Sequence, residues 1–215
     1  MQNKKFLSGG MLSVILILSI LLIDQVLKIH IKTTMTLGEA IHVTDFFYID
    51  FVENPGMAYG MTFINKLVLS LLRIVVISVI CFYLHRIIKE GARLRYVLFL
   101  SMIIAGAMGN IFDSMFYGLI FSESTPFQVA TFVPFGTGYE DFLKGKVVDM
   151  FYFPMIKSTY PDWVPFKGGE EFIFFSPVFN FADACISVGV VCLLLFCRKD
   201  LETLTLFSQK TEVKE

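Results

Sequence analysis

Aspartate and asparagine side chains interrupt segments that are otherwise strongly apolar. One such segment begins VFNFADACIS at residues 178–187, where Asn180 and Asp183 are one helical turn apart. A carboxylate inside a bilayer costs about 2.5–3.5 kcal/mol on insertion scales, so one that is kept there is a candidate for function. Two carboxylates held within about 3–4 Å cannot both ionise easily, so one keeps its proton while the other can take a proton from water. Such a pair would have the acid–base division of an aspartic peptidase.

Three more places carry polar groups of this kind. Asp24 and Lys28 are spaced i, i+4 in one apolar segment, and Asn110 and Asp113 share a helical face in another. Asp149 follows two valines in GKVVDMF and precedes aromatic residues. Each group alone has a structural alternative, because an ion pair at a helix end or a hydrogen bond between helices would use the same residue types.

The composition indicates a membrane protein. The chain of 215 residues is 55% hydrophobic and 17% charged, with a mean hydropathy of +0.69, whereas a soluble domain carries about 25% charged residues. A net charge of −1 and the lack of a dense basic run exclude a nucleic-acid partner. The four cysteines lie in apolar segments without metal-binding spacing, so we expect no metal and no cofactor.

Four segments are apolar over about 20 residues, the length that a helix needs to cross a bilayer. We therefore predict a single all-α membrane domain over residues 1–215, with four transmembrane helices at about 11–29, 67–85, 96–120 and 178–197. The first segment is too long for the apolar region of a signal peptide and has no cleavage site after it, so we expect a retained helix.

Basic residues set the orientation of these spans. Both termini and the loop 86–95 are rich in lysine and arginine, which predicts that they are cytoplasmic. The connections at about 30–66 and 121–177 then face outward. Residues 41–54 partly alternate in polarity and predict a small β-element with a turn near Asn54. The second outer loop holds six prolines and many aromatics, and we expect it to lie on the outer membrane surface, where its Trp163 and tyrosines would suit the headgroup region.

With this topology the polar groups collect at one depth. The first and third helices run outward and the fourth runs inward, so their carboxylates and asparagines all lie at the outer boundary of the bilayer. Asn54 and Asp149 lie in the two outer loops. This clustering predicts one shared site at the outer leaflet rather than a proton path through the membrane.

Five blocks in order resemble the bacterial lipoprotein signal peptidases, the type II signal peptidases. These blocks are DQVLK at 24–28, ENPGMAYG at 53–60, GAMGNIFD at 106–113, KVVDMF at 146–151 and FNFADA at 179–184. The resemblance implies that Asp149 and Asp183 are the catalytic aspartates, which activate a water for peptide hydrolysis. It implies substrate-binding or supporting roles for Asp24, Lys28, Asn54, Gly56, Ala58, Gly109, Asn110, Asp113, Asn180 and Ala182.

The resemblance also implies a substrate and a location. The family removes the signal peptide from prolipoproteins, cutting before a cysteine that already bears diacylglycerol, at the outer face of the bacterial cytoplasmic (inner) membrane. The implied partners are these diacylglyceryl-modified prolipoproteins and membrane lipid, with cyclic peptides of the globomycin type as inhibitors. Which aspartate carries the shared proton stays open.

Two features depart from the family pattern. Family members commonly carry an arginine where this chain has Ser114. The positive charge of that arginine is therefore supplied here by Arg73 or Lys28, or it is absent. Residues at about 152–176 form an added aromatic-rich stretch whose role the sequence does not give. Two other functions stay as alternatives: a small proton-coupled transporter, which needs ionisable groups through the full membrane depth, and a non-catalytic scaffold, in which Asp149 would be dispensable.

Overall fold

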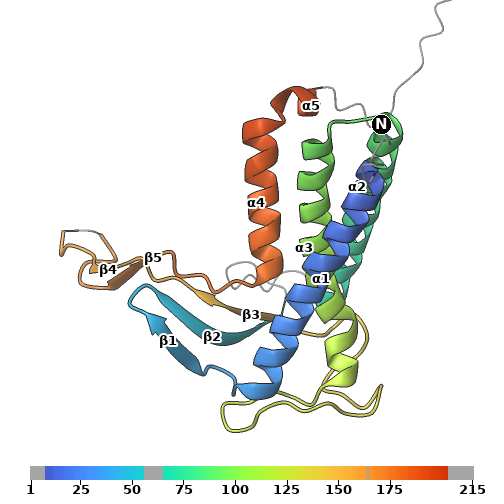
Figure 1. Ribbon diagram of the computed structural model, residues 1–215. Coiled ribbons are helices and arrows are strands. Elements are labelled where there is room, and N and C mark those ends of the chain that lie inside the picture. The colour runs from blue at the N-terminus through green and yellow to red at the C-terminus, as the bar shows by residue number, and fades with distance from the viewer. Residues whose placement is uncertain (1–7, 56–64, 164, 203–215) are drawn as a thin grey trace, which may run out of the picture.

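The chain forms a helix bundle with β-structure at one end (Figure 1). The structure is a computed structural model that describes residues 8–55, 65–163 and 165–202. Its longer helices are α1 (Gly9–Thr34), α2 (Lys66–Lys89), α3 (Leu94–Ile120) and α4 (Phe181–Phe196), and the short α5 (Arg198–Glu202) follows α4. The strands are β1 (Ala40–Thr44), β2 (Phe47–Asn54), β3 (Val147–Tyr152), β4 (Ile156–Thr159) and β5 (Glu171–Phe174).

Of the helices that the structure describes, α1, α2 and α3 are long and apolar enough to cross a membrane. Helix α4 is apolar but has 16 residues, so it is shorter than the expected span at 178–197. It begins later because Asn180 is its N-cap, with an extended backbone and a side chain that accepts the N–H of Asp183. Three expected spans are thus confirmed by length and composition, and a fourth crossing by α4 stays a prediction.

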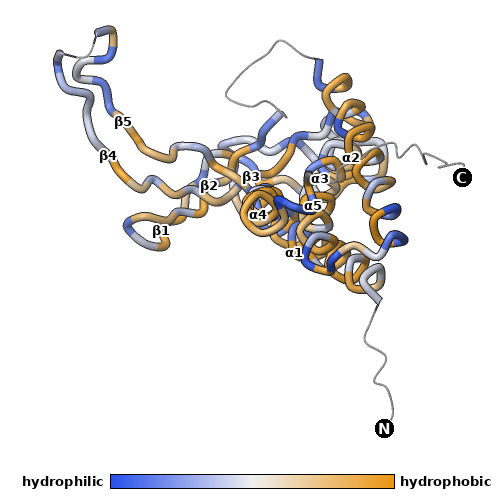
Figure 2. The backbone as a smooth tube through the Cα atoms, turned by 90° about the horizontal axis from the view of Figure 1, so that it is seen from above, coloured by the Kyte–Doolittle hydropathy of each residue, from blue (hydrophilic) through white to orange (hydrophobic). Residues whose placement is uncertain are grey.

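Helix α3 lies at the centre of the bundle and contacts the other three long helices (Figure 2). Small residues let it approach α4 closely, as is common between helices in membranes. A β-carbon added at Gly106 would collide with the carbonyl oxygen of Ala182, and one at Gly189 would lie 2.8 Å from a side-chain carbon of Ile103. The backbones of α3 and α4 therefore meet beside the segment that carries Asn110 and Asp183.

A three-stranded antiparallel sheet in the order β1-β2-β3 closes the end of the bundle. Strands β1 and β2 confirm the expected β-element within residues 41–54. Strand β3 differs from the sequence prediction, which places Asp149 in a loop, whereas this residue pairs with Val52 of β2. The sheet is anchored by Phe51, Val148 and Met150, which are buried against Tyr117 of α3.

The second outer segment also contains a hairpin that the sequence did not predict. Strands β4 and β5 pair antiparallel, with Ile156 opposite Phe174 and Thr159 opposite Glu171. This hairpin occupies most of the added stretch at 152–176. The β-structure is therefore larger than the small element expected, and it comes from both outer segments.

Candidate active site

The polar residues singled out in the sequence meet where the bundle joins the three-stranded sheet. Helices α1, α3 and α4 and strands β2 and β3 each contribute to this site. The convergence is confirmed by direct contacts among eight side chains, those of Asp24, Lys28, Asn54, Asn110, Asp113, Asp149, Asn180 and Asp183.

A buried ion cluster forms the inner part of the site. The Nζ of Lys28 lies 2.9 Å from Asp24 and 2.8 Å from Asp113, and all three side chains are almost fully buried. Asp24 also accepts the backbone N–H of Ala182 at 3.0 Å, which ties α1 to the start of α4. A β-carbon at Gly109 would lie 2.6 Å from the Asp24 carboxylate, so only glycine leaves room for this cluster.

Two asparagines connect this cluster to the proposed catalytic carboxylates. Lys28 donates to the side-chain oxygen of Asn110 at 2.8 Å. The amide of Asn110 in turn donates to Asp183 at 2.7 Å. The amide of Asn180 donates to Asp149 at 2.6 Å and to the oxygen of Asn110 at 3.1 Å. One continuous network of hydrogen bonds therefore holds both carboxylates.

The helix start fixes the position of Asp183. Asn180 and Asp183 form a capping box, in which the Asn180 side chain accepts the Asp183 N–H at 2.9 Å. The Asp183 carboxylate accepts the Asn180 N–H at 3.4 Å in return. Because both residues sit at the start of α4, the helix end that orients the carboxylate also supplies the amide that reaches Asp149.

The sheet fixes the position of Asp149. On the neighbouring strand, the side-chain amide of Asn54 donates to the second Asp149 oxygen at 3.3 Å. Burial, and then the negative charge of Asp183, raise the pKa of Asp149 to about 7. The hydrogen bonds from Asn54 and Asn180 act in the opposite direction on this pKa. Asp149 therefore titrates near neutral pH, where a group can both hold and release a proton.

A cavity of about 320 Å³ adjoins Asp183 between α2, α3 and α4. Its polar lining comes from Arg73, Asn110 and Asp183. Its apolar lining comes from Leu72, Val76, Ile77, Ala107 and Ile186. Leu72 and Val76 are 54% and 47% exposed, so the cavity reaches the outer surface of the bundle.

The chain matches a family model described as signal peptidase (SPase) II over residues 16–198. The chain belongs to the signal peptidase II family. It is 50% identical over 206 residues to a lipoprotein signal peptidase of Porphyromonas gingivalis, covering 95% of this chain and 90% of that protein. A lipoprotein signal peptidase of Amoebophilus asiaticus is 34% identical over 200 residues, covering 90% and 80% of the two chains.

Solved structures support the same fold. One bacterial membrane enzyme, determined by the in meso method at 2.3 Å, matches with a TM-score of 0.61 and 22% identity over 98% of this chain and 100% of that chain. A second, determined at 1.9 Å, matches with a TM-score of 0.59 and 23% identity over 93% and 99%. Membership of the signal peptidase II family favours neither the transporter nor the scaffold alternative.

Sequence reasoning missed Gln25 and Tyr117, which also contact the residues of this candidate site. The amide of Gln25 donates to Asp113 at 2.9 Å, to Asp24 at 3.1 Å and to the carbonyl of Gly109 at 3.3 Å. The buried hydroxyl of Tyr117 donates to the Gln25 oxygen at 3.1 Å. A signal for Gln25 was present, because it lies between Asp24 and Lys28 in the DQVLK block.

A second buried ionic group beside the site was also missed. Lys32 of α1 pairs with Glu53 of β2, and Ser124 donates to the same carboxylate at 2.8 Å. Burial opposes ionisation of Glu53, but Lys32, then the hydrogen bond from Ser124 and then Lys146 outweigh it and hold the pKa of Glu53 below its usual value. The group ties the end of α1 to the residue next to Asn54.

The remaining expected site residues fall into two groups. Ala182 is fully buried and contributes its backbone N–H to Asp24. Gly56 and Ala58, which the resemblance placed in the outer-loop motif, lie outside the described residues.

Proposed function

We propose that this signal peptidase II family member is a membrane aspartic endopeptidase in which Asp149 and Asp183 activate the hydrolytic water. As a member of the family, the chain removes signal peptides from prolipoproteins. The observation that carries the aspartic mechanism is the hydrogen-bond network that holds one carboxylate on a strand and the other at a helix start. The high pKa of Asp149, about 7, supports a division of roles between them.

In this mechanism the protonated member of the pair polarises the scissile carbonyl, and the ionised member takes a proton from the attacking water. The proton then passes to the leaving amine as the peptide bond breaks. Asp24, Lys28 and Asp113 do not touch the substrate in this scheme. They fix Asn110, and Asn110 fixes Asp183.

The enzyme's placement follows from the same proposal. We infer a multi-pass protein of the bacterial inner membrane, with four spans, both termini cytoplasmic and the active site at the outer leaflet. The basic loop between α2 and α3 supports this orientation. The catalytic pair then lies at the depth at which a diacylglyceryl anchor would hold the substrate cysteine, and the cavity beside Asp183 would receive apolar parts of the substrate or a cyclic-peptide inhibitor of the globomycin type.

The function is tested with purified wild-type protein and one prolipoprotein in two forms, with and without diacylglycerol on its cysteine. We expect cleavage before the modified cysteine, read by the masses of both products, and no cleavage of the unmodified form. Equal cleavage of both forms would contradict the lipid-dependent substrate, and cleavage of neither would contradict the peptidase function.

The pH dependence tests the state of Asp149. If Asp149 must be protonated and has a pKa of about 7, kcat/KM should fall as the pH rises above neutral. The apparent pKa of this pH profile belongs to the pair of aspartates together. Because the Asn54 amide lowers the pKa of Asp149, Asn54→Ala should move this alkaline limb to higher pH. The pH profile of kcat/KM is measured from about pH 5 to 9 in an Asn54→Ala variant that still folds. If its alkaline fall occurs at the same pH as in the wild type, Asn54 does not act on the titrating group.

Family members commonly carry an arginine at the position of Ser114. Of Arg73 and Lys28, Arg73 is better placed to supply that positive charge in this chain. Lys28 is held by Asp24 and Asp113, whereas Arg73 lines the cavity, and the carboxylates that act on it are those of Asp183 and Asp149. We expect Arg73→Gln to lower kcat/KM by about 10²-fold, the order seen when one preorganised donor is removed.

The matched control for Arg73 is Arg86→Gln, which removes the same charge from the other end of α2. Arg86 pairs with Glu90 on an exposed surface, so we expect its loss to leave kcat/KM within about twofold of wild type. Equal effects of the two substitutions would mean that Arg73 acts only on folding or insertion.

A further inference from the structure

The β4–β5 hairpin extends sideways from the helix bundle. In Figure 1 it projects away from the base of α4, and in Figure 2, viewed from above, it reaches well beyond the helices. Because the two views differ by 90°, they agree that the hairpin runs across the helix axes rather than along them. A hairpin that crosses the axes of membrane-spanning helices runs parallel to the membrane plane.

The hairpin exposes large apolar side chains that a water-facing hairpin would not favour. At its tip, Trp163 is 81% exposed and Phe166 is fully exposed. Near its base, Met155, Ile156 and Phe174 are each at least half exposed. Polar groups accompany them, since the ammonium of Lys167 lies 5.6 Å from the centre of the Tyr160 ring.

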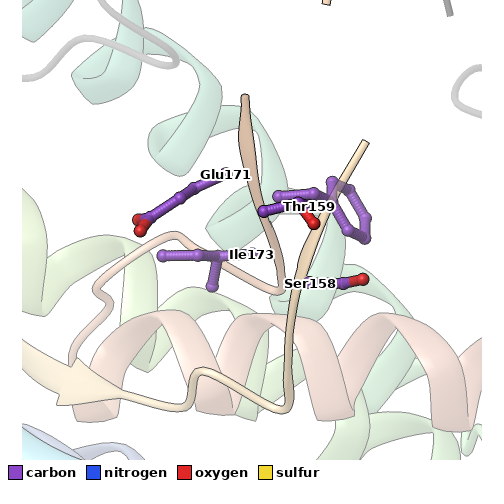
Figure 3. A pocket seen from close by; sticks show the side chains of 5 residues that line it. Ser158, Thr159, Glu171 and Ile173 are labelled. Atoms are coloured by element: carbon purple, nitrogen blue, oxygen red, sulfur yellow. The ribbon is translucent and has the colours of Figure 1, made fainter. Parts of the chain in front are cut away.

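Polar and apolar side chains are mixed on the same faces of the hairpin. A shallow cavity of about 510 Å³ on it is lined by Ser158, Thr159, Glu171, Phe172 and Ile173. Figure 3 shows Glu171 and Ile173 pointing to one side, so that a carboxylate and a branched aliphatic group share one face. A hairpin with such mixed faces fits neither a protein interior nor bulk water. It fits the lipid headgroup region, because aromatic rings and charged groups are both stable there.

The hairpin is also connected directly to a helix with exposed apolar side chains. The chain runs directly from β5 into α4, where it pairs Phe179 with Phe151 of β3 just before the helix begins. Along α4, Val188, Val191 and Leu195 are at least half exposed. Exposed apolar side chains therefore occur both on α4 and on the hairpin, which joins α4 at the end of the bundle that carries Asp149 and Asp183.

We propose that the β4–β5 hairpin lies in the membrane–water interface of the outer leaflet, with Trp163 and Phe166 inserted among the lipid headgroups. Its partner is the lipid surface itself. The hairpin would then hold the sheet that carries Asn54 and Asp149 at a fixed height above the bilayer. This inference needs a membrane-embedded bundle but no catalytic activity.

The test uses the intrinsic fluorescence of Trp163, which is the single tryptophan of the chain. Full-length protein is placed in phosphatidylcholine nanodiscs whose acyl chains are unlabelled, brominated near the headgroup, or brominated near the chain end. We expect the shallow bromines to lower the Trp163 emission about twofold or more, and the deep bromines to lower it much less. Aqueous iodide should quench weakly.

A depth control is provided by Trp163→Phe combined with Val75→Trp, since Val75 lies midway along α2 and is 59% exposed. Its emission should be quenched most by the deep bromines. Strong iodide quenching of Trp163 without any bromine effect would overturn the proposal, because the hairpin would then lie in water. Protection from both quenchers would overturn it as well, because the hairpin would then fold against protein. Neither result depends on cleavage, so the proposed peptidase function is judged separately.

Discussion

Asp149→Asn and Asp183→Asn should each lower the rate of prolipoprotein cleavage by about 10³-fold or more, with substrate binding retained. Asparagine keeps the size of the side chain and removes the proton that the pair exchanges with water. Its oxygen can still accept the amide of Asn180 at position 149, or that of Asn110 at position 183, so the network around each site survives in part. The loss should therefore appear in kcat, measured in single-turnover assays with lipid-modified substrate.

Asp50→Asn is the matched control, because Asp50 lies on β2 in the same sheet and pairs with Ala40 rather than with a site residue. It should cut at close to the wild-type rate. A variant at position 149 or 183 that also cuts at close to the wild-type rate would remove that residue from the catalytic pair.

Folding is checked independently by thermal unfolding. Burial raises the pKa of Asp149 to about 7, so the free energy of unfolding of the wild type should fall as Asp149 ionises at higher pH. Asp149→Asn should thus be no less stable than wild type in mildly alkaline buffer.

The part of this site that lies on helices is predictable from the sequence because helical periodicity is local. Residues three or four apart share a face, so spacing alone correctly pairs Asp24 with Lys28 and Asn180 with Asp183. The direction of each helix then sets the depth of its polar end. The structure adds that Asp113 shares Lys28 with Asp24, a contact between helices that no spacing within one helix reveals.

The part that lies on strands is not predictable in the same way. Asp149 sits in a strand whose partner carries Asn54, 95 residues earlier in the chain. Such pairing depends on tertiary contacts, and the surrounding proline-rich sequence favours an irregular loop. Gln25 is missed for a different reason: although it lies inside the DQVLK block, its contacts with Gly109 and Asp113 form only when α1 and α3 pack together.

Lys28→Met should unfold the site, with a loss of about 3–5 kcal/mol in the free energy of unfolding, because it leaves buried carboxylates without their counter-ion. Methionine fills a similar volume, so the effect would arise from charge rather than from a cavity. Asp24 and Asp113 both depend on this ammonium, and the Asn110 oxygen loses one of its two donors, keeping only the amide of Asn180. The midpoint of thermal unfolding in detergent, read with a thiol-reactive dye on the buried Cys185 and Cys197, measures the loss.

The exposed pair Lys144 with Asp141 gives a matched comparison, because it has the same residue types at 2.7 Å on the surface. Lys144→Met should change stability by less than about 1 kcal/mol. Adding Asp113→Asn to Lys28→Met removes one uncompensated charge, while the asparagine oxygen can still accept the amide of Gln25, so the double variant should recover part of the lost stability. If it is less stable than Lys28→Met alone, then Lys28 does not serve as the counter-ion of this cluster, and the chain of contacts from Lys28 through Asn110 to Asp183 loses its electrostatic basis.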